Sequence, residues 1–164
     1  MKTRRNLVSR LLFVASFGIL GAFAFTACNK KDEDKNNNKT MYSISGNAST
    51  SQVVPAVSGT GTAAITGTYN SGNGQLITST TWSNLSGVPI TGGFYMGASG
   101  TNGSLIGDLW SLGTSLSTSG TFSDTTTLTA DQATALKSGN VYYSLATSTN
   151  PNGEVRGQLT ATAQ

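Results

Sequence analysis

Apolar and polar residues alternate in short runs along most of the chain after residue 40. These runs are rich in Thr, Val, Ile and aromatic residues, and clusters of Gly, Asn and Ser separate them, which is typical of strands in antiparallel sheets. The pattern predicts strands near residues 41–46, 51–57, 60–69, 75–83, 90–97, 104–110, 119–128, 140–147 and 153–161. The expected fold class is all-β: an antiparallel β-sandwich or barrel of Greek-key or immunoglobulin-like type with one short helix.

The helix is predicted from a single capping signal. Thr129 and Gln132 have the spacing of a capping box, in which each side chain bonds the backbone N–H of the other residue. The helix is expected over residues 130–137, with Lys137 placed favourably at its C-terminal end. Hairpin turns are expected at residues 70–74 and 100–103, where Gly and Asn cluster.

The clearest turn precedes the last predicted strand. The sequence Asn-Pro-Asn-Gly at residues 150–153 has the preferred residue at each position of a type I turn. It would join residues 141–145 and 153–159 in a hairpin. Alternation then places Val155, Gly157 and Leu159 on one face of the strand, and Glu154, Arg156 and Gln158 on the other.

Glu154 and Arg156 are close enough in sequence to pair across one face of that strand. They could form a polar recognition site, or a structural ion pair whose guanidinium also bonds neighbouring backbone. Gly157 indicates a close backbone approach or a bulge beside them, which favours the structural interpretation.

Aromatic residues offer a second candidate surface. They could form a platform for glycans or peptides, but most lie in alternating strand patterns and are expected in the core. The residues concerned are Trp82, Phe94, Tyr95, Trp110, Tyr142 and Tyr143.

The N-terminus has the organisation of a lipoprotein signal peptide over residues 1–27. A cationic start precedes an apolar stretch at residues 11–25, too short for an ordinary spanning helix, which ends in small residues before Cys28. This resembles a bacterial lipobox, in which the cysteine is diacylated and becomes the first residue of the mature protein. The alternatives are a plain signal peptide or an uncleaved anchor, with Cys28 an incidental thiol.

Residues 28–40 are expected to form a lipidated polar tether, because residues 29–39 contain no apolar side chain that could order them. Lysines followed by acidic residues directly after the cysteine resemble the surface-export signal of Bacteroidetes lipoproteins. The expected location is the outer membrane, with the domain at residues 41–164 exposed on the cell surface. The alternative is a spacer that only holds the domain away from the membrane.

Charge and composition exclude several classes of function. The formal net charge of +3 divides into +5 over residues 1–40 and −2 over residues 41–164, where Lys137 and Arg156 are the only cations. Two cations cannot form the basic surface that nucleic acid requires. The sequence has no histidine and one cysteine, which excludes a disulfide framework, imidazole-based metal sites and Ser-His-Asp catalysis. No cofactor is expected.

Three motifs resemble the CHRD (chordin-type) domain over residues 43–160. They are Gly-Glu-Val-Arg-Gly-Gln-Leu at residues 153–159, Ser-Gln-Val-Val-Pro-Ala-Val at 51–57 and Gly-Ala-Ser-Gly-Thr-Asn-Gly at 97–103. The resemblance implies an antiparallel β domain. The family commonly carries His-x-His and a further histidine at positions that correspond to Gly93, Tyr95 and Ala146 here.

The sequence therefore predicts a non-enzymatic binding or adhesion domain, anchored to the membrane by lipid, whose partner is an extracellular protein or glycan. A metal-binding or superoxide-dismutase-like domain is the alternative suggested by the family's histidines. A hydrolase that pairs Glu154 with another carboxylate is a third hypothesis.

Overall fold

The computed structural model describes residues 39–113 and 117–164. The expected signal peptide, Cys28 and nearly all of the expected tether lie outside the described residues. The first strand, β1, starts at Met41, which is the first residue of the expected domain.

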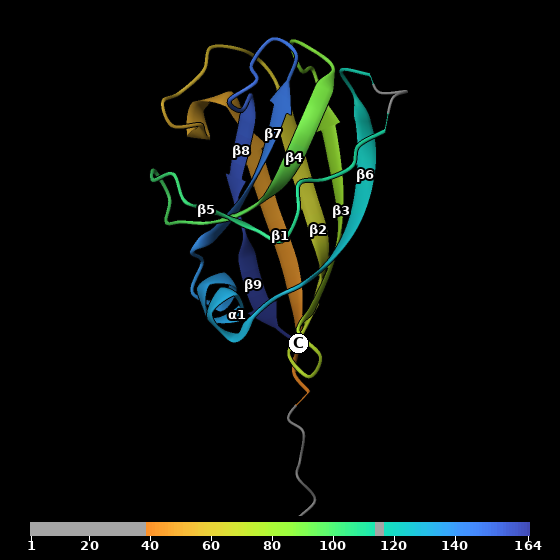
Figure 1. The fold of residues 1–164 in the computed structure, drawn as a ribbon, viewed down its shortest axis with the longest axis vertical. Coiled ribbons are helices and arrows are strands. Elements are labelled where there is room, and N and C mark those ends of the chain that lie inside the picture. Colours follow the sequence, from red (N-terminus) through yellow and green to blue (C-terminus); the bar gives the residue numbers. More distant parts are fainter. Residues whose placement is uncertain (1–38, 114–116) are drawn as a thin grey trace, which may run out of the picture. The chain divides into compact units, whose positions relative to one another are not determined.

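The domain is a single antiparallel sheet of nine strands that curves into a half-barrel (Figure 1). The strands run in the order β5-β4-β7-β8-β1-β2-β3-β6, and β9 pairs with the first part of β1. Their bounds are β1 Met41–Ser49, β2 Thr62–Asn70, β3 Gln75–Ser83, β4 Pro89–Met96, β5 Ser104–Ile106, β6 Gly120–Thr127, β7 Val141–Thr147, β8 Val155–Gln158 and β9 Thr160–Ala163. The predicted all-β antiparallel fold with one short helix is confirmed.

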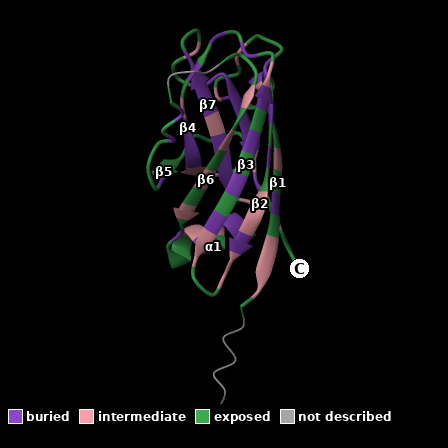
Figure 2. Cartoon of the chain, turned by 90° about the vertical axis from the view of Figure 1, so that its right-hand side faces the viewer, coloured by how far each residue is buried: buried purple, intermediate pink, exposed green. Residues whose placement is uncertain are grey.

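The core lies inside the curve of the sheet. Figure 2 shows the alternation of buried and exposed residues along β3, which follows from the two-residue period of a strand. The largest fully buried side chains include Trp82, Phe94 and Tyr143. The predicted core role of most aromatic residues is thus confirmed, because Trp110 and Tyr142 are buried as well.

The single α-helix of the described residues, α1 (Ala130–Lys137), has the predicted bounds and capping box. The Thr129 hydroxyl accepts from the Gln132 amide at 3.3 Å, and the Gln132 side chain accepts from the Thr129 amide at 2.9 Å. In residues 39–113 and 117–164, no helix has the length and apolar character needed to cross a bilayer.

The strand predicted at residues 51–57 is wrong. A short 3-10 helix, η1 (Thr50–Gln52), is followed there by irregular backbone. The Thr50 carbonyl accepts hydrogen bonds from the amides of Val53 and Val57, which closes the segment on itself. Pro55 has no N–H to give to a ladder, so the segment cannot be a paired central strand.

Two other predicted strands are shorter or interrupted. The strand expected at residues 104–110 ends at Ile106, because Gly107 adopts a positive φ of 66° and the chain leaves the sheet. The strand expected at residues 153–161 divides into β8 and β9 around Leu159, whose side chain is buried in the core.

Candidate functional site

Glu154, Arg156 and Gln158 form a row on the outer face of the closing hairpin. The predicted hairpin is present, and its register places Leu145 opposite Val155 and Tyr142 opposite Gln158. The predicted turn is closed by a 3.1 Å hydrogen bond from the Gly153 amide to the Asn150 carbonyl. Val155 and Leu159 enter the core, as the alternation predicts. Two members of the row are nevertheless buried, with Glu154 1% exposed and Arg156 3%, and Gln158 is half-buried.

Glu154 holds the β3–β4 loop against the end of β7. Its Oε1 accepts from the Ser86 amide at 2.5 Å, and its Oε2 accepts from the hydroxyls of Ser86 at 2.8 Å and Thr147 at 2.6 Å. Burial alone would raise the pKa of this carboxyl, but the donated hydrogen bonds outweigh it and hold the pKa below its usual value. The group is therefore a carboxylate at neutral pH.

Arg156 holds the β4–β5 loop. Its NH2 donates to the carbonyls of Ala98 at 3.0 Å and Thr101 at 2.7 Å, and its NH1 donates to Oδ1 of Asn102 at 3.3 Å. The guanidinium also lies over the Tyr142 ring, with Cζ 3.6 Å from the centroid. Burial lowers the pKa of Arg156.

Gln158 completes the row by joining two further turns. Its Nε2 donates to the carbonyl of Gly97 at 2.9 Å and to that of Gly139 at 2.7 Å. Gly97 is the first residue of the β4–β5 loop, and Gly139 lies between α1 and β7. Each polar side chain of the row therefore holds at least one loop to the sheet.

The expected ion pair between Glu154 and Arg156 is not formed. Among the described residues, the polar contacts of Glu154 lie at Ser86, Thr147 and Asn150, and those of Arg156 lie at residues 98–102 and Tyr142. Glu154 and Arg156 bind different loops, and each side chain has its own hydrogen-bond partners there. The expected close backbone approach is present, since a Cβ on Gly157 would lie 2.6 Å from the Asn47 carbonyl oxygen in β1.

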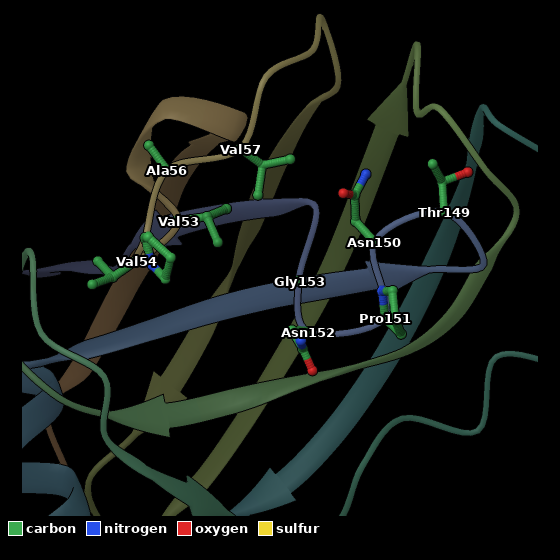
Figure 3. Close-up of a pocket in the computed structure, with 10 residues that line it drawn as sticks. Val53, Val54, Ala56, Val57, Thr149, Asn150, Pro151, Asn152 and Gly153 are labelled. Carbon is green, nitrogen blue, oxygen red and sulfur yellow. The ribbon is translucent and has the colours of Figure 1, made fainter.

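A groove lies beside this row at the end of the sheet where β1 ends (Figure 3). We call it the loop-end groove. Residues 53–57 form one wall, residues 149–153 form the other, and its volume is about 250 Å³. A second hollow of about 270 Å³ shares Val53, Val54 and Asn152 with it and extends to Tyr95 and Arg156.

The lining of the loop-end groove is uncharged and combines apolar with polar residues. One wall carries three valines and a proline, and the other presents the amides of Asn150 and Asn152. None of the lining residues has an ionisable side chain. Such a surface can bind apolar groups and exchange amide hydrogen bonds, but it supplies no general acid or base.

The positions that correspond to the family's histidines lie on β4 and β7. Tyr95 is half-buried and stacks on Tyr142, with ring centroids 5.2 Å apart and 13° between the planes. Gly93 and Ala146 are buried. In the described part of the chain, no group of three or more His, Cys, Asp or Glu residues could hold a metal ion.

Sequence reasoning missed the partners of Glu154. Ser86 lies 68 residues away in the chain, and no local pattern distinguishes it from the many other serines of the domain. Thr147 ends a strand whose residues are nearly all buried, so its hydroxyl could not be assigned in advance.

Comparison with protein-family models matches residues 44–159 to the CHRD domain. The match begins in β1, ends at Leu159 and contains the whole polar row. No curated protein and no solved structure matches the chain.

Proposed function

The chain belongs to the CHRD domain family, and from this premise we propose that it is a lipid-anchored cell-envelope protein whose domain binds an extracellular protein or glycan without catalysing a reaction. Cys28 would carry the lipid and residues 29–38 would connect it to Lys39. Two acyl chains on one cysteine are enough for stable anchoring, whereas a single chain is marginal.

The observation that carries the proposal is the position of the loop-end groove. β1 begins at Met41, two residues after the first described residue, and ends at Ser49, directly before η1 and the groove wall. Eight steps of about 3.4 Å separate the two ends of β1 by about 27 Å. Figure 1 shows the entering chain and η1 at opposite ends of β1. A domain attached through Lys39 would carry the groove at the end of β1 that is farther from the attachment point.

The chemistry of the site supports binding over catalysis. Three donors occupy the Glu154 carboxylate, which is 1% exposed, so it is not available to a substrate. The hydrolase hypothesis would need this carboxylate beside a second one with room for a substrate between them. The loop-end groove instead offers valine, proline and amide groups.

Anchoring is tested by Cys28→Ser in the full-length chain, expressed in a bacterium that processes lipoproteins and grown with labelled palmitate. We expect wild type in the membrane fraction with label, and the variant without label in any fraction, because Cys28→Ser removes the acylated thiol. Asn36→Gln, a change in the same polar segment, should behave as wild type. Unlabelled wild-type protein, or a variant that still takes up label, would contradict the anchoring.

Binding is tested with the detergent-solubilised full-length protein on arrays of glycans and extracellular matrix proteins. Val57→Glu places a charge in the loop-end groove and should abolish the strongest signals. Ile77→Glu is the matched control, because it introduces the same charge at an exposed aliphatic residue that lies on β3 outside the groove. If Val57→Glu and Ile77→Glu give equal array signals, the binding belongs to another surface of the domain.

A further inference from the structure

A second groove lies on the side of the domain, between the segment that follows β5 and the edge strand β6. Residues 107–111 form one wall, and Phe122 with residues 124–127 forms the other. We call it the side groove. Its volume of about 440 Å³ lies within the range of about 300–1,000 Å³ that small-molecule sites occupy. It shares no lining residue with the loop-end groove.

Trp110 is fixed in the first wall. Its amide donates to the Gly92 carbonyl at 2.8 Å, and a Cβ on Gly92 would overlap Cε3 of the indole. Its ring lies edge-on to Phe94, with ring centroids 5.2 Å apart, and packs against the ring of Phe122, with centroids 5.6 Å apart. The indole edge that carries Cε3 and Cζ3 therefore faces β4, and the opposite edge, which carries Nε1, is turned away from it.

The Nε1–H of Trp110 is a buried donor that no described residue satisfies. The other tryptophan differs, because Nε1 of Trp82 donates to the Ser117 carbonyl at 3.0 Å. A buried donor without a partner is unfavourable, and native proteins normally satisfy it with protein, water or ligand. At a groove wall, an oxygen from outside the chain can fill this role.

The carboxylates in the walls supply acceptors. Asp108 is exposed, and none of the described residues donates a hydrogen bond to it. Asp124 accepts from the Thr126 hydroxyl at 2.6 Å through Oδ2. The described lining residues include no Lys or Arg, so like charge disfavours an anionic ligand.

A fixed N–H donor together with carboxylate acceptors selects a group that both accepts and donates. A hydroxyl does both, whereas an ammonium group or a metal cation cannot accept from the indole N–H. Phe122 and the exposed Leu109 add an apolar surface to the polar walls. We propose that the side groove is a saccharide-binding site for a neutral sugar, held by Trp110, Asp108 and Asp124.

This inference goes beyond the proposed function, because it adds a site that is independent of the loop-end groove and of the anchor. The test uses the detergent-solubilised full-length protein and neutral trisaccharides of glucose, galactose, mannose and N-acetylglucosamine. Binding is measured by calorimetry and by the two indole N–H resonances in a ¹H–¹⁵N correlation spectrum. The sequence has two tryptophans, and Trp110→Phe assigns the resonances.

We expect at least one trisaccharide to bind and to shift the Trp110 indole resonance while that of Trp82 stays in place. Asp108→Asn and Asp124→Asn should each weaken binding about tenfold or more, since each removes a charge-assisted hydrogen bond. Asp131→Asn is the matched control, because Asp131 lies in the first turn of α1, outside the groove.

Val57→Glu should leave saccharide binding unchanged. Absence of binding at the loop-end groove can therefore be distinguished from absence of binding at the side groove. Calcium alone and a lysine-rich peptide are titrated in parallel. The proposal is overturned if no trisaccharide binds, if both aspartate variants bind as wild type, or if only calcium or the peptide shifts the Trp110 resonance.

Discussion

Glu154 connects two loops through one carboxylate. The Ser86 and Thr147 hydroxyls that donate to it also accept from Asn150, Ser86 from its side chain at 3.1 Å and Thr147 from its amide at 3.1 Å. The charge therefore orders the β3–β4 loop and the β7–β8 turn together. An acceptor held by three donors is sensitive to any change that introduces a donor.

Glu154→Gln should lower the free energy of unfolding by about 1–3 kcal/mol, because one carboxylate oxygen becomes an NH₂ group that faces hydroxyl donors. Each hydroxyl could accept a hydrogen bond from the new NH₂ group, but its own O–H would then lose the acceptor that Glu154 provides. Urea unfolding at neutral pH measures the change. Asp131→Asn, at an exposed position, should leave the free energy within about 0.5 kcal/mol of wild type. An equally small effect of Glu154→Gln would show that the network does not stabilise the fold.

The lowered pKa of Glu154 predicts a pH dependence of stability. The folded state holds this proton less tightly than the unfolded chain, whose glutamate has a pKa of 4.5. The stabilisation is therefore present above about pH 4.5 and is lost as the pH falls through the lower folded pKa.

Urea unfolding of wild type and Glu154→Gln between pH 7 and pH 3 checks this dependence. The stability difference between the two proteins should shrink as the pH falls below 4.5, because titration of the other carboxylates is common to both. A difference that stays constant over the range would contradict the assignment.

At the scale of elements, β8 depends on how closely it approaches β1. Arg156 pairs with Ser49 of β1, and Gly157 is the next residue. A Cβ on Gly157 would lie 2.6 Å from the Asn47 carbonyl oxygen and 2.9 Å from the Ala48 Cα. Both contacts are to backbone, which cannot move aside as a flexible side chain would.

Gly157→Ala should therefore separate β8 from β1 and lower the free energy of unfolding by about 1–3 kcal/mol. Gly93→Ala is the matched control in β4 of the same sheet, where the nearest atom is the terminal Cδ1 of the exposed Leu105, at 3.1 Å. Urea unfolding compares the two variants, and hydrogen exchange of the β8 amides locates the change. Equal effects of the two alanines would contradict the role given to the backbone approach.

Elements with local causes were predictable from sequence. Thr129 and Gln132 predicted the helix because both members of a capping box lie within one turn of chain. The strand at residues 51–57 was wrongly predicted because its apolar residues line a groove wall in irregular backbone. The separation of Glu154 from Arg156 was also beyond prediction, since the loop residues that bind them, Ser86 for Glu154 and residues 98–102 for Arg156, lie 54 to 68 residues away.

At the scale of the whole molecule, the chain enters the domain at one end of β1, and the loop-end groove lies at the other end. Lys39 lies beside the β2–β3 turn, where a Cβ on Gly72 would come 2.9 Å from Cγ of Lys39. Asn73 in that turn and Asn152 in the loop-end groove are both exposed. If Cys28 is lipidated, the length of chain up to Lys39 would limit the distance of Asn73 from the membrane more strictly than that of Asn152.

Single cysteines at these two positions test that arrangement, because acylation of Cys28 would leave no other thiol in the mature chain. On intact cells, Asn152→Cys should react faster than Asn73→Cys with a bulky polyethylene glycol maleimide, which the membrane obstructs at the anchored end. A small maleimide should label both, and release with detergent should make the two rates equal. Equal rates on intact cells would contradict the orientation, and labelling of neither position before permeabilisation would place the domain on the inner side of the outer membrane.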